Sequence, residues 1–254
     1  MQDVTSTRQD VRCRCAGPPP VASTLTAMIA ADDDLQLLRR LTPCTTWTDA
    51  VETLRDAGWS PCGTGDWAFA LRSPGGATVA RISPFDPAAP YTAALYREAA
   101  TTGQVPRLIQ HLDLAGGARL TVMEHLDPVP EADAAAFLTG LHDDPALAAL
   151  AVTVRAVHER GAREQPFWGP LDANPDNVRR GLDGRLVLSD PYYADGPRLY
   201  RTAAEDPDAV VRAIPPDLRR HLTEIPLAAS GPWEHGDRER LRATLAAADA
   251  RAGN

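Results

Sequence analysis

The chain has 254 residues and contains no lysine, so all 26 of its basic residues are arginine. Chemistry that other proteins assign to lysine must therefore be carried out by arginine in this chain, or be absent from it. Two explanations stay open. The bias is drift in a GC-rich genome, since Ala, Arg, Pro and Gly are all heavily used, or it is selection against lysine as the acceptor of protein-tagging modifications and of acylation.

Other scarcities exclude whole classes of protein. No apolar run approaches the roughly 18 residues that a membrane helix needs, so no membrane partner is expected. The net charge is −8, and without a basic surface no nucleic-acid partner is expected. The four cysteines form no C-x-x-C pair, which argues against structural zinc and favours a reduced, cytoplasmic setting. The 44 % of apolar residues suits one full core or one two-lobed domain.

The chain divides into four predicted segments. Residues 1–23 are polar and proline-rich and predict a disordered tail, and residues 24–57 predict helices. Residues 58–126 are rich in predicted strands, and residues 127–254 are helical apart from one hairpin. This order predicts an α+β fold with a β-rich N-terminal lobe and a helical C-terminal lobe.

Hydrophobic periodicity gives the boundaries of the individual elements. The predicted strands are Trp59–Gly63, Phe69–Arg72, Ala77–Ile82, Leu108–Leu114 and Arg119–Met123, with a later hairpin of Asn177–Arg180 and Arg185–Ser189. The predicted helices are Asp32–Leu41, a helix capped by Thr46 and stopped by Gly58, Tyr91–Thr101, Asp133–Leu141, Pro145–Arg160 and Gly236–Ala250.

The predicted hairpin brings oxygen-rich side chains together. The loop Asp172–Asn177 precedes its first strand, and Asp190 follows its second strand. Because a short hairpin returns the chain on itself, Asn177 and Asp190 can lie close enough to hold Mg²⁺, which prefers hard oxygen ligands. Asp172 would then face the reacting centre as a base or an orienting group. The alternative is a plain Asp/Asn/Pro-rich turn that caps the hairpin.

A second candidate site lies between the first two predicted strands. The loop Gly63–Ala68 contains glycines that let a backbone approach phosphates closely, although for the loop taken alone a plain hairpin turn is the better explanation. Arg81 in the next strand and Glu98 in the following helix add a basic residue and a carboxylate that could orient it. The sequence therefore predicts a site for phosphates.

In these residues the chain resembles the protein-kinase-like superfamily, which includes aminoglycoside phosphotransferases and related small-molecule kinases. The resemblance covers roughly residues 58–200 and keeps the order of six motifs. They are the glycine loop Gly63–Ala68, the strand Val79–Ile82 with its basic residue, Glu98, the hinge Val122–Leu126, the catalytic loop Asp172–Asn177, and Asp190 in Ser189–Pro191.

The resemblance implies ATP and Mg²⁺ as cofactors and gives each residue a role. Gly63, Gly65 and Ala68 would close over the phosphates, which Arg81 would hold while Glu98 orients it. The carbonyl group of Glu124 and the amide group of Leu126 would bind adenine, Asn177 and Asp190 would hold Mg²⁺, and Asp172 would orient or deprotonate the acceptor hydroxyl. The implied activity is transfer of the γ-phosphate to a hydroxyl of a small molecule or a protein.

Several departures from the superfamily pattern define the alternatives. Arg81 replaces the usual lysine, Pro170 replaces the histidine that often opens the catalytic loop, and no A-P-E motif follows Asp190. Glu124 and Asp172 are only 48 positions apart, which leaves room for two helices but not for a full antibiotic-binding subdomain. The competing interpretation is a pseudokinase that acts as a nucleotide-gated binding module. The acceptor and the oligomeric state are left open by the sequence.

Overall fold

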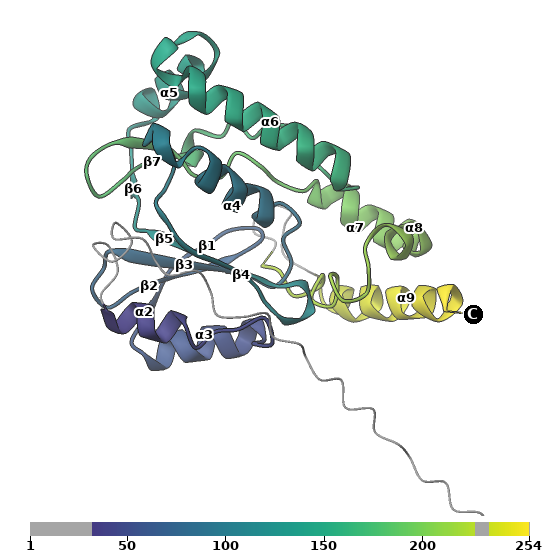
Figure 1. Cartoon of the computed structure of the whole chain (residues 1–254). Helices are drawn as coiled ribbons and strands as arrows, with labels where there is room; N and C mark the ends of the chain where they lie inside the picture. Colours follow the sequence, from purple (N-terminus) through teal and green to yellow (C-terminus); the bar gives the residue numbers. More distant parts are fainter. Residues whose placement is uncertain (1–31, 227–233, 254) are drawn as a thin grey trace, which may run out of the picture.

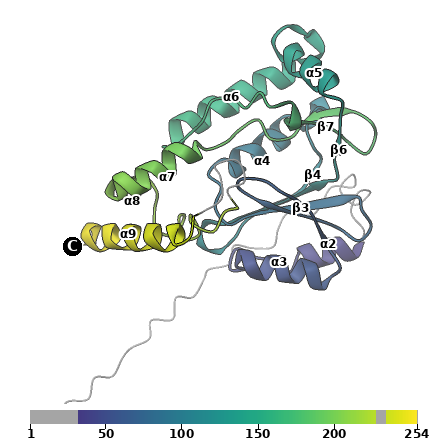
Figure 2. The same cartoon turned by 180° about the vertical axis from the view of Figure 1, so that it is seen from behind.

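A computed structural model describes residues 32–226 and 234–253 of the chain. The predicted α+β fold with a β-rich lobe followed by a helical lobe is confirmed. Helices α2 (Asp32–Leu38) and α3 (Trp47–Asp56) cover one face of the N-terminal sheet, and α4 (Ala89–Glu98) lies on the other side (Figures 1 and 2). The predicted tail of residues 1–23 lies outside the described residues.

The N-terminal sheet has five antiparallel strands in the order β1-β2-β3-β5-β4. Its strands are β1 (Ser60–Thr64), β2 (Phe69–Arg72), β3 (Thr78–Ser83), β4 (Leu108–Asp113) and β5 (Arg119–Glu124). All five predicted strands are therefore confirmed to within one or two residues at each end. Because β3 lies at the centre of the sheet, Arg81 is paired with Ala70 on one side and with Thr121 on the other.

The helix α3 shows how local sequence positions the N-terminal layer. The Thr46 side chain accepts a hydrogen bond from the backbone N–H of Asp49 at 3.1 Å, so the predicted cap is confirmed. Ala50, Val51 and Leu54 point into the core that this layer shares with the sheet. The periodic apolar face therefore fixes which side of the sheet α3 covers.

The C-terminal lobe contains helices and one small sheet. The helices are α5 (Glu131–Asp143), α6 (Ala148–Glu164), α7 (Gly196–Glu205), α8 (Pro207–Ala213) and α9 (Asp237–Ala252). Leu150, Val154 and Val157 form the buried face of α6 that the sequence predicts, and they pack in one core with residues of α4. Among the described residues, no helix is long and apolar enough to cross a membrane.

The small sheet carries the hairpin of the predicted catalytic loop. Strands β6 (Asp127–Pro128), β7 (Val178–Arg180) and β8 (Leu186–Leu188) form it in that order, and Val178 is paired with Leu188. The hairpin is confirmed, whereas β6 is an addition that no pattern in the sequence predicts, because a two-residue edge strand is too short to show alternation.

The two lobes also meet at the far end of the N-terminal sheet. The turn between β4 and β5 lies against residues 218–221, and an ideal Cβ built on Gly117 would stand 2.2 Å from the carbonyl oxygen of Leu218. The indole N–H of Trp47 donates to the Glu224 carboxylate at 2.8 Å beside this contact. Because backbone meets backbone here without room for a side chain, Gly117 permits the approach of the lobes.

A matched pair of glycines tests this contact. Gly117 and Gly184 both have positive φ angles, 84° and 85°, but an added Cβ at Gly184 would meet nothing within 4 Å. The left-handed backbone alone should cost Gly184→Ala about 1–2 kcal/mol. We expect Gly117→Ala to lower the free energy of unfolding by distinctly more, measured by urea denaturation. Equal losses of unfolding free energy in the two variants would mean that the lobes can move apart at Gly117 without a cost in stability.

Candidate active site

One cleft between the lobes collects most of the predicted site residues. It has a volume of about 450 Å³ and is lined by the β1–β2 loop, by β3, by Met123 and by residues of the segment 174–193. Of the predicted residues, the cleft brings together Gly63, Gly65, Ala68, Arg81, Asn177 and Asp190. Glu98, Glu124, Leu126 and Asp172 are not among the residues that line it.

The glycine loop, Gly63–Ala68, lines one side of this cleft. The backbone N–H of Gly65 donates to the Ala68 carbonyl at 2.9 Å, and an added Cβ at Gly65 would meet nothing within 4 Å. The loop is held at its other end by the buried Trp67, whose carbonyl accepts a hydrogen bond from the Ser83 hydroxyl. Trp67 packs against Phe85 and Tyr200 in a buried cluster.

Arg81 lies between two carboxylates. Its Nη2 atom is 3.2 Å from Asp86 Oδ2 and 3.1 Å from Asp190 Oδ2. Burial lowers the pKa of Arg81, but Asp190 and Asp86 more than offset this effect, so its pKa is raised and the guanidinium stays charged. Oδ1 of the buried Asp86 also accepts the N–H groups of Ala88 and Ala89 at the start of α4. Asp86 thus ties the guanidinium group to the helix terminus.

The predicted pairing of Arg81 with Glu98 is wrong. Glu98 is 44 % exposed and binds Arg160, with Nη2 and Oε1 2.7 Å apart. The reason is the rotation of α4, because Tyr96 is the residue that faces Arg81 and Asp190. Two further residues turn a helix by about 200°, so Glu98 points away from the cleft.

Sequence reasoning missed three residues around Arg81. Asp86 supplies the carboxylate, while Thr92 and Tyr96 line the helix face beside Asp190. The spacing of four residues between Thr92 and Tyr96 places them on one face of a helix and is the signal that could have identified that face. The Tyr96 hydroxyl donates to the Ser189 carbonyl, which fixes the chain just before Asp190.

Asp190 and Asn177 carry the features that a cation site needs. Burial raises the pKa of Asp190 to about 6, Arg81 opposes the rise, and Asp86 and Asp172 add to it. Its Oδ1 atom is buried and has no hydrogen-bond partner in the described part of the chain, which leaves it available to a cation. The buried Asn177 Nδ2 atom also lacks a partner there, but as an amide donor it suits a phosphate oxygen and not the cation. The Ser189 N–H and hydroxyl groups both donate to the Asn177 carbonyl, at 2.7 and 2.9 Å, and hold the two residues together.

This donor set fits Mg²⁺ shared with phosphates. One carboxylate and one amide oxygen leave most positions around the ion to water and phosphate oxygens, which is how Mg²⁺ is usually held. Among the described residues, no cluster of three or more His, Cys, Asp or Glu side chains could form an all-protein metal cage. The predicted ligands are therefore compatible with a cation that arrives with a nucleotide.

The loop of Asp172 is fixed by short-range hydrogen bonds. The backbone N–H of Asp172 donates to the Pro191 carbonyl at 2.9 Å, and its Oδ1 atom accepts the N–H of Asn174 at 3.0 Å. Its charge contributes to the raised pKa values of Asp190 and Tyr193, so the carboxylate lies near both side chains. Asp172 thus lies beside the cleft that Asp190 lines, where an acceptor hydroxyl would have to approach.

An α6 histidine supports this loop where the expected histidine is missing. Pro170 stands where the superfamily pattern often has the histidine that opens the catalytic loop. The His158 Nε2 atom, from α6, donates to the carbonyl of the preceding residue, Gly169, at 3.1 Å. The ring of His158 lies 5.7 Å from that of Trp168 and 6.2 Å from that of Tyr192. The half-buried His158 therefore packs beneath the loop.

The predicted hinge is only partly in the cleft. Met123 lines it, whereas the side chain of Glu124 is fully buried and accepts the N–H of Arg107 at 2.8 Å. The N–H group of His125 donates to the Ala77 carbonyl at 2.7 Å and continues the pairing of β3 with β5. Binding of adenine to the backbone of Glu124 and Leu126 stays a prediction.

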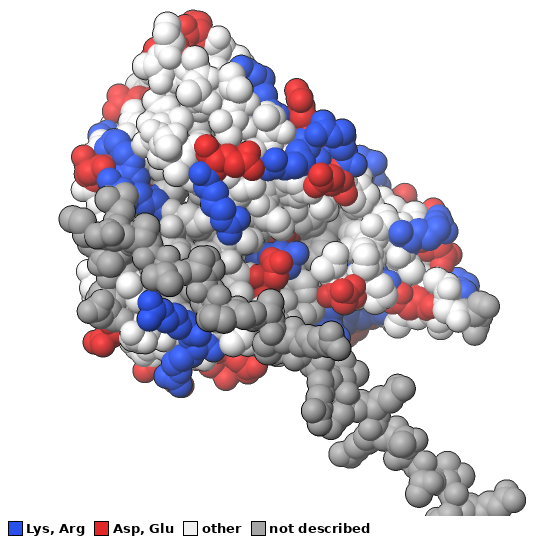
Figure 3. Space-filling model, viewed as in Figure 1, with Lys and Arg blue, Asp and Glu red and all other residues white. Residues whose placement is uncertain are grey.

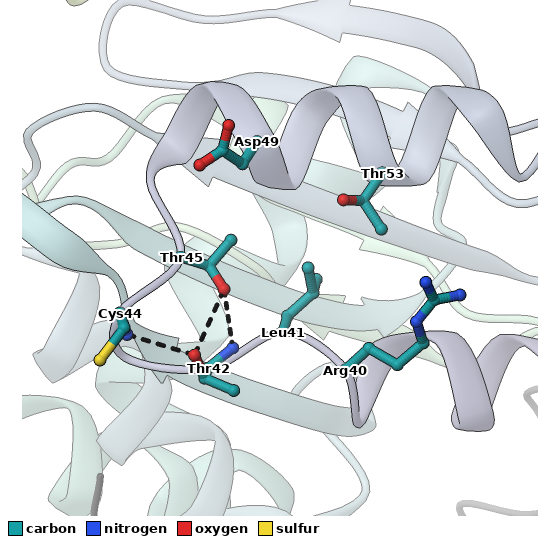
Figure 4. A pocket seen from close by; sticks show the side chains of 7 residues that line it. All are labelled: Arg40, Leu41, Thr42, Cys44, Thr45, Asp49 and Thr53. Carbon is teal, nitrogen blue, oxygen red and sulfur yellow. Dashed lines mark hydrogen bonds between the residues drawn. The ribbon is translucent and has the colours of Figure 1, made fainter. Parts of the chain in front are cut away.

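A second hollow lies outside this cleft. It has a volume of about 370 Å³ and lies where α2 and α3 meet (Figure 4). The hydroxyl groups of Thr42 and Thr45 satisfy each other and the nearby backbone, at distances of 3.0 to 3.4 Å. No sequence motif falls on it, so the cleft remains the candidate active site.

On the face shown in Figure 3, acidic and basic side chains are interspersed.

Comparison with known proteins gives similarity to solved structures only. No family model and no curated protein matches the chain. A crystal structure of an aminoglycoside-3'-phosphotransferase of type VIII is 19 % identical and has a TM-score of 0.34, with 80 % of this chain and 98 % of that chain covered.

Two kinases are also similar. The PknI kinase domain of Mycobacterium tuberculosis is 15 % identical, with a TM-score of 0.27 and coverage of 74 % of this chain and 95 % of that chain. Choline kinase LicA from Streptococcus pneumoniae is 11 % identical, with a TM-score of 0.25 and coverage of 74 % and 82 %. Because each of these three TM-scores is below 0.5, the roles of individual residues depend on the geometry of this chain.

Two carboxamide variants test which acid holds Arg81. Asp86→Asn keeps the helix cap but removes a charge-assisted hydrogen bond at a buried site, which should cost about 1.5–3 kcal/mol of unfolding free energy. Glu98→Gln removes one partner of an exposed pair and should cost no more than about 1 kcal/mol. Urea denaturation at one pH measures both. A larger loss for Glu98→Gln would contradict the assignment of Asp86.

Proposed function

We propose that the chain is an ATP- and Mg²⁺-dependent phosphotransferase that moves the γ-phosphate of ATP to a hydroxyl group. The observation that carries the proposal is the single cleft in which the glycine loop, Arg81 and the pair Asn177 and Asp190 meet. The buried Asp190 Oδ1 and Asn177 Nδ2 atoms, which have no hydrogen-bond partner in the described residues, support it because the unpaired acceptor suits a cation and the unpaired donor suits a phosphate oxygen.

Each residue then has a role that its surroundings support. Arg81 binds the α- and β-phosphates through its planar guanidinium, which matches phosphate oxygens bidentately. Asp86 contacts Arg81 at 3.2 Å without help from Asp190. It therefore keeps the guanidinium group in place when Asp190 binds the cation. The open backbone of Gly63 and Gly65 covers the phosphates.

The acceptor hydroxyl is oriented by Asp172. Asp172 and its loop are fixed to the segment after Asp190 by the bond to the Pro191 carbonyl, at 2.9 Å. Asn177 and Asp190 would hold Mg²⁺, which when bound supplies charge neutralisation on the β- and γ-phosphates. Positioning and electrostatic stabilisation then account for most of the rate acceleration. A small molecule and a protein are both candidate carriers of the hydroxyl.

One observation favours a second candidate, a nucleotide-gated binding module without turnover. Arg81 forms a direct ion pair with Asp190, so the proposed cation ligand is already engaged by a guanidinium group. A chain of this kind would bind Mg·ATP and respond to it but transfer no phosphate. Turnover, and not binding, separates the two candidates.

Variants of two carboxylates test the division of roles. We expect Asp172→Asn to lower turnover by about 10²–10⁴-fold, the usual contribution of a general base, while Mg·ATP binding is kept. Asp190→Asn should abolish the Mg²⁺-dependent part of nucleotide binding. ATP consumption and calorimetric titration measure the two effects, and Asp176→Asn is the matched control because its side chain is 82 % exposed on the same loop.

Three outcomes would contradict this account. Equal losses of nucleotide affinity in Asp172→Asn and Asp190→Asn would refute the division of roles. Mg·ATP binding by the wild-type chain without turnover that depends on Asp172 would favour the binding module. Absence of binding at millimolar Mg·ATP would refute both candidates.

A further inference from the structure

Four charged side chains form a network next to the predicted hinge, Val122–Leu126. Glu124 is fully buried, and its carboxylate binds the guanidinium group of Arg185 and lies 3.6 Å from Arg107 Nη1. Asp183 completes the network, at 2.5 Å from Arg107 and 2.6 Å from Arg185. Two carboxylates therefore face two guanidinium groups, and the charges balance.

The network joins parts of the chain that carry different halves of the proposed nucleotide site. Glu124 follows Met123, which lines the cleft, whereas Asp183 and Arg185 belong to the turn between β7 and β8. This hairpin begins just after Asn177 and ends just before Asp190. The ion pair of Glu124 with Arg185 thus links the end of β5 to the hairpin of both proposed cation ligands.

The hairpin also makes hydrogen bonds to backbone carbonyls that precede β4. The backbone N–H of Leu188 donates to the Gln104 carbonyl at 2.9 Å, and the Arg185 Nη2 atom donates to the Val105 carbonyl at 3.4 Å. Arg81 contacts Asp190 at the end of the same hairpin. The hairpin therefore has attachments to the N-terminal lobe at its turn and at its base.

Stability alone does not require charges at this place. Burying an ion pair costs desolvation free energy. Replacing it with well-packed uncharged groups often leaves the stability unchanged or increases it. What a bidentate guanidinium–carboxylate contact adds is a fixed distance and orientation between the segments that it joins.

We propose that Glu124 and Arg185 are positioning residues that set the distance between the hinge and the cation-binding hairpin, so that one ATP molecule reaches both. This inference rests on the proposed function. Neither side chain touches the nucleotide, and the predicted adenine contact of Glu124 uses its backbone carbonyl, which the variants leave in place. Their loss should weaken ligands that span both halves of the site and spare a ligand that uses the phosphate half alone.

The test is the double variant Glu124→Gln/Arg185→Met. The amide oxygen that replaces the Glu124 carboxylate can still accept the Arg107 N–H, Asp183 keeps its pair with Arg107, and no buried charge is left alone. Dissociation constants of Mg·ATP and of Mg·triphosphate, the inorganic ion, are measured by calorimetry. We expect the constant for Mg·ATP to rise about tenfold or more, because small misplacements are costly in oriented sites, and that for Mg·triphosphate to stay unchanged.

A matched control removes an arginine–carboxylate pair at another place in the chain by the same kind of substitution. Arg219→Met/Asp249→Asn breaks the ion pair between a buried arginine, 5 % exposed, and α9. This control should leave both dissociation constants unchanged. If the double variant at the hinge does not fold, the single Glu124→Gln variant, which keeps the Arg185–Asp183 pair, should show the same selective loss to a smaller extent.

The outcomes separate this inference from the proposed function. Unchanged affinity for both ligands, or parallel loss of both, in a folded hinge variant would overturn the positioning role while the wild-type chain still binds Mg·ATP. A wild-type chain that binds neither ligand would instead refute the proposed function.

Discussion

The candidate site depends on the contact of one arginine with two carboxylates. Arg81 lies on the central strand of the N-terminal sheet, Asp86 on the turn to α4, and Asp190 at the end of the β7–β8 hairpin. The Asp86 carboxylate is only 3 % exposed and the Arg81 side chain 21 %, so leaving either of them without an opposite charge would be costly. The three groups therefore fix one another and, through them, a strand, a helix terminus and a hairpin.

The absence of lysine gives this contact its chemical meaning. A lysine ammonium is a compact point charge, whereas the guanidinium group is wider and presents several donors in a plane. Arg81 can contact both acids through one nitrogen and leave its other donors for a ligand. The second acid comes from the turn before α4, so Arg81 has a carboxylate partner besides Asp190. This arrangement is compatible with catalysis as well as with binding.

Much of the fold could be predicted because its signals are local. The five strands, the Thr46 cap and the β7–β8 hairpin follow from alternation, cap chemistry and turn residues that each lie within a few positions. The cleft could also be anticipated, since glycines, Arg81 and Asp190 keep a characteristic order. The predictions of the elements need only the neighbours of each residue, whereas the cleft follows from the order of motifs on which the family resemblance rests.

The errors and omissions share one physical cause. Whether Glu98 or Asp86 meets Arg81 depends on the rotation of α4, which packing of Tyr96 against the cleft decides. The ion pair of Glu124 with Arg185 joins residues 61 positions apart, and their proximity exists only after the lobes have assembled. Local patterns could not give these contacts because nothing near either residue in the sequence specifies its partner.

The measurement that tests the central claim most directly is a crystal structure with Mg²⁺ and a non-hydrolysable ATP analogue. The account predicts the cation on Asp190 and Asn177, the phosphates under the glycine loop, and the Arg81 guanidinium on phosphate oxygens while it remains on Asp86. A cleft without nucleotide at saturating concentration, or a bound nucleotide whose phosphates do not contact Arg81, would contradict it.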